Sequence, residues 1–297
     1  MSPRISVIIP NHNYSRYLPE LFASLRAQSV GLGDVEVLFV DDASTDDSVT
    51  VARRQGETLG ALDFRLLRIA RQGRPGPVRN VGLAAARGRY LLCMDSDDVL
   101  ESRFLEATLA ALKQDPRAGL AYTDLVRITP DGMHHVALPE CTLDLLRQQN
   151  VVSSMVLLRR EAYEACGGFR GDTLYEDWDM WLRIVAAGFT APHVPEALYV
   201  YRVHADSFTS GAVMRDAQAK AAIVLANRQV FPATVAAWAR GVMRGEAWAA
   251  PFGRGLIPRP EDVRRLRQIA QDVLRRRLEQ KPKPESDHYP RMNNRGG

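Results

Sequence analysis

Apolar runs and amphipathic segments alternate along the first 114 residues. The runs are short, apolar and bounded by turn residues, which is typical of buried strands, and they lie at 5–10, 35–40, 64–69 and 90–94. Segments with helical periodicity follow them at 17–28, 47–55, 78–87 and 102–114. This alternation predicts an α/β fold, in which helices cover both faces of a parallel sheet.

The pattern changes after residue 114. Further strands are predicted at 120–128, 155–158 and 197–203, and helices at 143–149, 161–166 and 172–187. From residue 211 onward the pattern is helical, with segments at 214–230, 233–244 and 260–279. Residues from 281 are polar and contain proline, so we expect a disordered tail there.

The fourth apolar run ends in the acidic sequence Asp95-Ser-Asp97-Asp98. Three carboxylates so close together repel one another, and a divalent cation such as Mg²⁺ or Mn²⁺ relieves that repulsion. Ligands of open α/β sheets bind beyond the carboxyl ends of the strands, where this cluster lies. The alternative is a turn whose aspartates cap the helix that follows.

Composition narrows the class of protein. Hydrophobic residues make up 46% and charged residues 25% of the 297 residues, as in ordinary globular proteins. The sequence has no apolar run of about 18 residues and no signal-peptide pattern. Its three cysteines are scattered and form no metal-ligand pair. We therefore expect a cytoplasmic protein.

Charge is unevenly distributed along the chain. Residues 211–297 hold 17 Lys and Arg against 8 Asp and Glu, whereas residues 1–210 hold 22 against 27. A basic tail of this kind indicates an anionic surface or partner. The glycine-rich dinucleotide fingerprint is missing after the first strand, and no P-loop sequence is present, which disfavours those two classes of nucleotide-binding enzyme.

Six motifs in order resemble the family 2 glycosyltransferases of the GT-A fold, over about residues 4–210. They are Pro10-Asn-His-Asn13, Val40-Asp-Asp-Ala-Ser-Thr45, Arg79-Asn80 with Gly82, Asp95-Ser-Asp-Asp98, Glu176-Asp177-Trp178, and Tyr201-Arg202 with His204. The resemblance implies transfer of a sugar, with inversion, from a nucleotide-sugar donor to an acceptor hydroxyl. A UDP-sugar is the expected donor, Mn²⁺ or Mg²⁺ the expected cofactor, and a carbohydrate or lipid-linked acceptor of surface polysaccharide or glycolipid synthesis the expected substrate.

The resemblance also implies a domain organisation. Residues 1–210 would form the GT-A catalytic domain, with a nucleotide-binding half at about 1–100 and an acceptor half at 101–210. Residues 211–280 would form a basic helical extension and residues 281–297 the disordered tail. The amphipathic helix at 260–279 can lie on the inner face of an anionic membrane, or pack on the catalytic domain or on a second subunit of a homodimer.

Site roles follow from the same resemblance. Asp97 would bind the metal, with Asp98 and His204 as further candidates. The expected sugar-donor site comprises Pro10, Asn13, Asp41, Asp42, Arg79, Asn80, Asp95, Ser96 and Arg202. Within it, the aspartate pair at 41–42 would bind the nucleotide base, and Arg202 the diphosphate. The alternatives are structural: helix capping for the aspartate pair and a solvated surface position for Arg79.

The predicted chemistry centres on Asp177. An inverting transfer needs one carboxylate to take the proton of the acceptor hydroxyl, and Asp177 would be that base with Glu176 as its support. Trp178 would pack on the acceptor sugar. The alternatives are that the two acids only complement the dipole of their helix and that Trp178 belongs to the core.

Two other functions remain open at this stage. A sugar-phosphate nucleotidylyltransferase would need a glycine-rich loop after the first strand, where Pro10-Asn-His-Asn13 stands. A non-catalytic module that binds membrane or nucleic acid through its basic helices would not require Asp97 or Asp177. We expect no nucleic acid partner.

Overall fold

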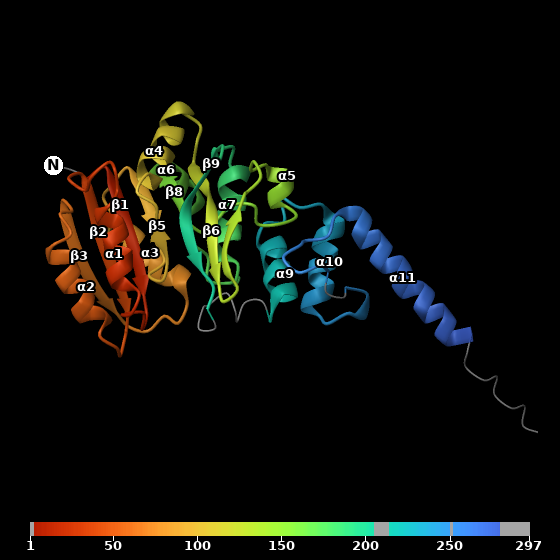
Figure 1. Cartoon of the computed structure of the whole chain (residues 1–297). Coiled ribbons are helices and arrows are strands. Elements are labelled where there is room, and N and C mark those ends of the chain that lie inside the picture. The colour runs from red at the N-terminus through yellow and green to blue at the C-terminus, as the bar shows by residue number, and fades with distance from the viewer. Residues whose placement is uncertain (1–2, 205–213, 250–251, 280–297) are drawn as a thin grey trace, which may run out of the picture.

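The computed structural model describes residues 3–204, 214–249 and 252–279. Its centre is one mixed sheet with the strand order β3-β2-β1-β4-β8-β6-β9-β5, and β7 pairs with β6 (Figure 1). The strands are β1 (Ile5–Asn11), β2 (Val35–Asp42), β3 (Asp63–Ile69), β4 (Tyr90–Cys93), β5 (Val99–Leu100), β6 (Leu120–Thr129), β7 (Gly132–Val136), β8 (Val156–Arg159) and β9 (His193–Arg202).

The first four strands are parallel, as the alternation predicted. β1 and β2 stay in register to their ends, where Asn11 pairs with Asp41. β4 pairs with the other side of β1, and Ile8 lies opposite Cys93. The carboxyl ends of β1, β2 and β4 therefore meet at one edge of the sheet, which brings their polar clusters together.

The second half of the sheet is mixed. β8 lies between β4 and β6 and is antiparallel to both, because Leu158 pairs with Leu91 and with Leu120. β9 runs parallel to β6, with register shifts beside Asp124. The pattern of apolar residues did not predict two strands. β5 is only two residues long, and the exposed sequence of β7, GMHHV, lacks an apolar run.

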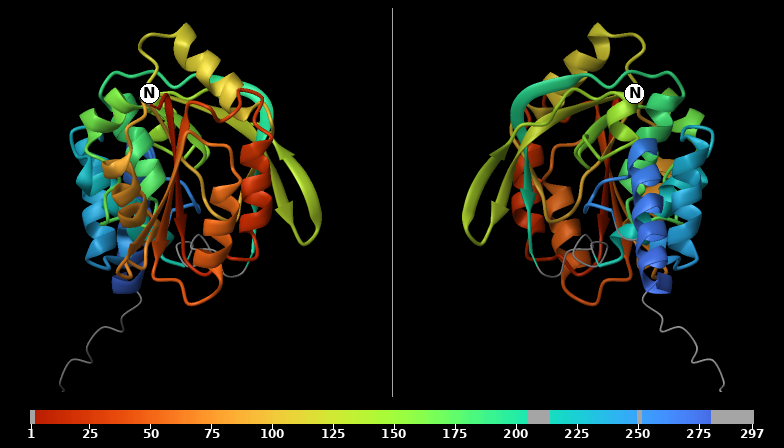
Figure 2. Two further views of the ribbon diagram at one scale, coloured as in Figure 1. Left: turned by 90° about the vertical axis from the view of Figure 1, so that its left-hand side faces the viewer. Right: turned by 90° about the vertical axis from the view of Figure 1, so that its right-hand side faces the viewer.

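Helices cover both faces of the sheet (Figure 2). They are α1 (Leu18–Arg26), α2 (Ser48–Glu57), α3 (Pro75–Ala85), α4 (Phe104–Gln114), α5 (Leu143–Leu146), α6 (Arg160–Cys166) and α7 (Glu176–Ala186). Alternate strand residues face opposite sides: Val7 and Ile9 pack with α1 and α4, and Ile8 packs with α3. The two faces hold separate hydrophobic clusters.

The C-terminal helices are α9 (Asp216–Ala226), α10 (Ala233–Met243) and α11 (Pro260–Glu279), with a 3₁₀ turn at Ala247–Ala249. Ile223 of α9 and Trp238 of α10 are fully buried in the cluster that also contains Trp181 of α7. The helical extension therefore shares its core with one face of the sheet. The expected boundary near residue 210 and the expected disordered tail at 281–297 lie outside the described residues.

The last helix projects from the body as an arm (Figure 1). Its first turn is anchored by Val263, which is 1% exposed, whereas Ile269 and Leu274 are 53% and 59% exposed. In the described ranges, no helix combines the length and the hydropathy that a membrane crossing requires.

Candidate active site

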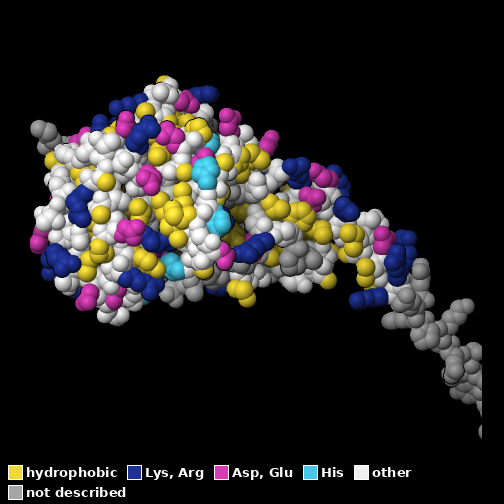
Figure 3. All heavy atoms as spheres, viewed as in Figure 1, with side chains coloured by type: hydrophobic (Ala, Val, Ile, Leu, Met, Phe, Trp, Pro, Cys, Tyr) yellow, Lys and Arg dark blue, Asp and Glu magenta, His cyan; other side chains and the backbone are white. Residues whose placement is uncertain are grey.

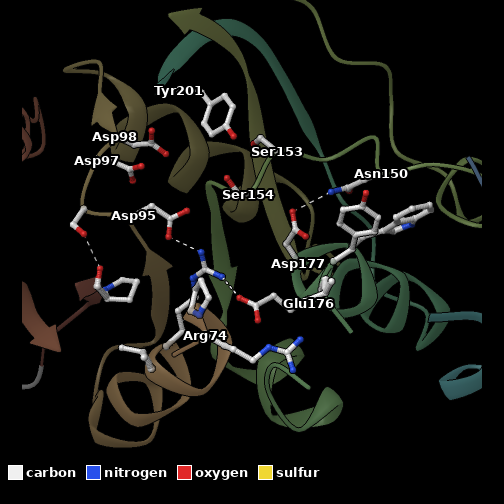
Figure 4. A pocket seen from close by; sticks show the side chains of 18 of the residues that line it. Arg74, Asp95, Asp97, Asp98, Asn150, Ser153, Ser154, Glu176, Asp177 and Tyr201 are labelled. Carbon is white, nitrogen blue, oxygen red and sulfur yellow. Dashed lines mark hydrogen bonds and ion pairs between the residues drawn. The ribbon is translucent and has the colours of Figure 1, made fainter. Parts of the chain in front are cut away.

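A pocket of about 1030 Å³ opens at the carboxyl edge of β1, β2 and β4. Loops after these strands form one side, and the start of α7 with residues 149–154 forms the other. Figure 4 shows Asp95, Asp97 and Asp98 across the pocket from Glu176 and Asp177. The acidic cluster and the proposed base thus share one cavity, although about 80 residues separate them in the sequence.

The loops after β1 and β2 are tied together by Asn13 and Ser44. The Asn13 side-chain oxygen accepts hydrogen bonds from the backbone N–H groups of Thr45 at 2.7 Å and Asp46 at 3.3 Å, and the backbone N–H of Asn13 donates to Ser44 Oγ at 3.0 Å. Asn13 has φ 59° and Ala43 has φ 56°, which are uncommon for residues other than glycine. These bonds hold the turns in a fixed shape at the mouth of the pocket.

The two aspartates at the end of β2, Asp41 and Asp42, lie in different environments. Asp42 lines the pocket, and its carboxylate accepts hydrogen bonds from Arg71 and from the backbone N–H groups of Gln72 and Gly73. Asp41 is fully buried, accepts a bond from the Ser44 N–H at 3.2 Å, and is not among the pocket-lining residues. Asp42 therefore organises the loop at 71–73 from within the pocket.

The acidic cluster after β4 contains two differently placed carboxylates. Asp97 Oδ2 lies 2.8 Å from His204 Nε2. Asp98 is 1% exposed, and its oxygens accept hydrogen bonds from the Tyr199 hydroxyl at 2.6 Å and from the Arg202 N–H at 3.1 Å. Burial and neighbouring carboxylates raise the pKa of both Asp97 and Asp98.

These residues fit a divalent cation. Across residues 3–204, 214–249 and 252–279, no cluster of three acidic, histidine or cysteine side chains is already arranged around a metal position. The Asp97–His204 pair nevertheless supplies one carboxylate and one imidazole, ligands that Mn²⁺ accepts. A cation there would also offset the repulsion that raises the pKa of Asp97. The Asp98 carboxylate instead accepts hydrogen bonds from Tyr199 and Arg202 of β9.

Arg79 connects the two sides of the pocket. The sequence allowed a solvated surface arginine here, but the residue is 7% exposed. Its guanidinium lies 2.5 Å from Asp95 and 2.6 Å from Glu176, and 5.3 Å from the ring centre of Phe169. Asn80 lies off the pocket lining, where its side chain bonds both the N–H and the carbonyl of Phe169.

Glu176 and Asp177 begin α7, where the helix dipole favours negative charge. Burial raises the pKa of Glu176 to about 7 in spite of Arg79. Asp177 is partly buried, which raises its pKa, and its Oδ2 accepts a hydrogen bond from Asn150 Nδ2 at 3.1 Å. Trp178 lines the pocket but is 2% exposed, and its indole N–H donates to the Leu146 carbonyl at 2.7 Å.

Several predicted residues are brought to the pocket and others are not. Pro10, Asn13, Asp95 and Ser96 line it, and Ser96 Oγ donates to the Pro10 carbonyl at 2.9 Å. Arg202 is absent from the lining, because its guanidinium binds Glu20 at 2.5 Å. Other lining residues were not predicted from the sequence, among them Arg74, Arg127, Asn150, Ser153, Ser154, Tyr199 and Arg254. Only Arg74 carried a signal, since it lies in a Gly/Pro loop.

Comparison with known proteins agrees with this geometry. The family model of glycosyl transferase family 2 matches residues 6–134, and that of glycosyl transferase family group 2 matches residues 90–250. The O-antigen biosynthesis protein RfbC of Myxococcus xanthus is 30% identical over 74% of this chain, which spans 17% of RfbC. The putative glycosyltransferase EpsE of Bacillus subtilis is 27% identical over 69% of the chain and 75% of its own length.

Solved structures show the same fold. Staphylococcus aureus TarS 1-349 in complex with UDP-GlcNAc has a TM-score of 0.61 at 20% identity, covering 75% of this chain and 66% of that one. The mannosyltransferase PcManGT from Pyrobaculum calidifontis, in complex with GDP-Man and Mn²⁺, has a TM-score of 0.60 at 19% identity, covering 92% and 81%. These neighbours confirm the GT-A fold. The model of glycosyl transferase family group 2 matches more than half of this chain, and the chain therefore belongs to that family.

Proposed function

We propose that this protein is a metal-dependent, inverting glycosyltransferase that uses a UDP-sugar. The observation that carries the proposal is that one pocket holds a cluster of aspartates and, facing it, a carboxylate at the start of a helix (Figure 4). A displacement with inversion needs a leaving-group site and a base on opposite faces of the sugar.

Asp177 is the proposed base. Its carboxylate lines the pocket and is held by Asn150, and partial burial raises its pKa toward the range in which a carboxylate accepts a proton efficiently. Glu176 holds Arg79, and Arg79 holds Asp95. The position of the base is therefore linked through one guanidinium to the sugar-donor side.

Asp97 and His204 are the proposed metal ligands, and Asp98 shapes the loop through Tyr199 and Arg202. A bound Mn²⁺ or Mg²⁺ would neutralise charge on the departing nucleotide diphosphate. The loop that Asp42 organises, at 71–73, and the turn held by Asn13 form the proposed nucleotide pocket. The complexes of TarS with UDP-GlcNAc and of PcManGT with GDP-Man and Mn²⁺ support a nucleotide-sugar donor and a metal.

The acceptor is proposed to be a hydroxyl of a cell-surface polysaccharide or glycolipid precursor. This rests on relatives named for O-antigen biosynthesis and for poly(ribitol-phosphate) N-acetylglucosaminyl transfer. A nucleotidylyltransferase would not require a base on the acceptor side. A non-catalytic module would not require Asp97 or Asp177.

The test is nucleotide release from UDP-, GDP- and dTDP-sugars with Mn²⁺, Mg²⁺ or a chelator. We expect slow hydrolysis of one UDP-sugar that the chelator and Asp97→Ala abolish. Thermal stabilisation by UDP plus Mn²⁺ provides a readout that does not depend on turnover. If no arm showed nucleotide release and no arm showed thermal stabilisation, the glycosyltransferase proposal would be ruled out.

We also propose that α11 places the enzyme on an anionic membrane surface. The arm carries arginines at positions 264, 265, 267, 275, 276 and 277 against the acids Glu261, Asp262, Asp272 and Glu279. Ile269, Val273 and Leu274 form an exposed apolar stripe on the same helix. Figure 3 shows hydrophobic and basic side chains together along the arm. A helix with an apolar stripe and an excess of arginine fits the boundary between lipid tails and anionic headgroups.

A further inference from the structure

The C-terminal extension supplies part of the pocket wall. Arg254, Gly255 and Leu256 line the cavity together with Tyr175 and Asp177. No sequence motif pointed to this segment, which follows α10 and lies more than 70 residues beyond the proposed base. The pocket is therefore closed on its acceptor side by residues from outside the predicted catalytic domain.

The segment is fixed in place from both ends. The buried Lys220 amine donates to the carbonyls of Phe252 at 3.1 Å and Gly253 at 2.9 Å. On the other side, the Ile257 N–H donates to the Gln148 carbonyl at 2.7 Å. Backbone groups held in this way define a rigid rim beside the pocket. Its anchor, Gln148, lies two residues before Asn150 in the sequence.

Asp216 connects this rim to the start of α7. Its Oδ1 accepts the Gly255 N–H at 3.0 Å and the Tyr175 hydroxyl at 2.8 Å. Tyr175 directly precedes Glu176 and Asp177. The backbone beside Arg254 is thus held by hydrogen bonds at a fixed position relative to the start of α7.

The charge of Arg254 is not matched by a carboxylate. Arg71 pairs with Asp42, and Arg79 pairs with Asp95 and Glu176. In contrast, Arg254 is exposed and forms no ion pair with any carboxylate of the described ranges. Its positive charge opposes the rise in the pKa of Tyr175 that burial and Asp216 cause, which places the guanidinium near that ring.

We propose that Arg254 binds an anionic oxygen group of the acceptor, a phosphate or a carboxylate, and so selects acceptors that carry such a group near the reactive hydroxyl. A guanidinium presents paired N–H donors that match either group. The proposal rests on the proposed function, because it assigns the acceptor end of that site. It predicts that the enzyme distinguishes charged from neutral acceptors even when their hydroxyls are alike.

The probes are glycerol, glycerate and glycerol 3-phosphate, with farnesyl diphosphate in detergent as the lipid arm. Each is added to the hydrolysis of the UDP-sugar by wild type, Arg254→Ala and Arg259→Ala. Arg259 lies on the same segment but does not line the pocket, and its guanidinium donates to the Gln148 side chain at 2.7 Å. Its substitution removes an equal charge elsewhere and leaves the backbone bond from Ile257 to Gln148 in place. Thermal unfolding and the unstimulated hydrolysis rate show whether each variant is folded and active.

We expect an anionic probe to change nucleotide release, either as an acceptor or by excluding water, while glycerol at the same concentration does not. Arg254→Ala should raise the concentration for half the effect by about tenfold, and Arg259→Ala should leave it unchanged. A response to glycerol 3-phosphate alone indicates a phosphorylated polyol, to glycerate alone a carboxylate, and to farnesyl diphosphate alone a lipid phosphate.

Two results would overturn the inference while leaving the proposed function intact. In the first, wild type responds equally to glycerol and to the anionic probes. In the second, Arg254→Ala responds as wild type does. Absence of both donor hydrolysis and stabilisation by UDP plus Mn²⁺ in wild type, by contrast, removes the proposed function itself and with it this inference.

Discussion

Arg79 and Glu176 form a buried ion pair across the pocket, with Nη1 2.6 Å from Oε1 and both side chains less than 10% exposed. The second nitrogen of the same guanidinium holds Asp95. This arrangement joins α3, the loop after β4 and the start of α7 at one point. It makes Arg79 a positioning residue for the carboxylates of both sides.

The first prediction concerns the stability of this network. Arg79→Met leaves Glu176 and Asp95 without their counter-charge, and should lower the free energy of unfolding by about 3–5 kcal/mol. The double variant Arg79→Met/Glu176→Gln should recover part of that loss, because Gln is neutral. Urea denaturation at pH 8 measures both.

The matched control is Arg103→Met, which breaks an exposed pair with Glu196. Exposed pairs contribute about 0–1 kcal/mol, so little change is expected. An Arg79 variant as stable as the Arg103 variant would contradict the interpretation of Arg79 as the central tie of the site.

The second prediction concerns the base. Asp177→Asn keeps the shape of the side chain and its proximity to Asn150 but removes the proton acceptor. We expect kcat for acceptor-dependent transfer to fall by about 10²–10⁴-fold. Titration calorimetry should show UDP affinity unchanged, because Asp177 lies on the acceptor side.

Asn150→Ala provides the comparison, since it removes the hydrogen bond to Asp177 and leaves the carboxylate. Its loss of kcat should be about tenfold or less. Retention of more than a tenth of wild-type kcat by Asp177→Asn would exclude this residue as the base.

The third prediction concerns pH. The raised pKa of Asp177 means that the base still holds its proton above the usual range for an aspartate, so transfer should lose rate as pH falls through that raised value. The negative charge of Asp95 adds to that rise in the pKa of Asp177, whereas the positive charge of Arg79 opposes it. Asp95→Asn removes that negative charge and should move the acid limb of the kcat profile, measured at saturating sugar donor, to lower pH. An unmoved or alkaline-shifted limb would show that Asp177 does not control it.

The parallel half of the fold could be predicted from the sequence because each strand there is a continuous apolar run with its own helix. β7 could not, because its hairpin is exposed and lacks an apolar pattern. The identity of the acidic clusters could be predicted from residue type and position at strand ends. Their partners could not, since no local pattern shows that Arg79 would reach Glu176 across 97 residues.

The contribution of residues 254–256 to the pocket could not be predicted from the sequence either. It depends on how α9 and α10 pack against α7, on the hydrogen bond that Asp216 accepts from Gly255, and on the one that Lys220 donates to Gly253. Arg202 shows the opposite case: its position after the last strand suggested a diphosphate ligand, but Glu20 in α1 lies close enough to pair with it.

The fourth prediction separates the carboxylates of the acidic cluster. Asp97→Ala and His204→Ala each remove a proposed ligand and should weaken Mn²⁺ binding in the presence of UDP by about 10–100-fold or more. Electron paramagnetic resonance of free Mn²⁺ measures this without turnover. Asp98→Asn should leave Mn²⁺ affinity nearly unchanged but lower thermal stability, because it weakens the bonds to Tyr199 and Arg202. If Asp98→Asn weakened Mn²⁺ as strongly as His204→Ala, Asp98 would be a ligand.

The last prediction concerns the arm. The full chain should sediment with vesicles that contain anionic lipid and not with neutral vesicles, and added salt should release it, because headgroup attraction to arginine is screened. Ile269→Glu/Leu274→Glu should abolish sedimentation, since both side chains are exposed on the apolar stripe. Met133→Glu is the control: Met133 is 69% exposed on the β6–β7 hairpin, away from α11.

The alternative is that the stripe binds a second copy of the chain. Light scattering on the same samples measures the molecular mass and so tests for a dimer. A dimer that Ile269→Glu/Leu274→Glu converts to monomer, together with no vesicle binding by wild type, would assign the stripe to self-association. Because the stripe begins only beyond the buried first turn of α11, either outcome leaves the pocket intact, and donor hydrolysis in the absence of lipid should be unchanged in the double variant.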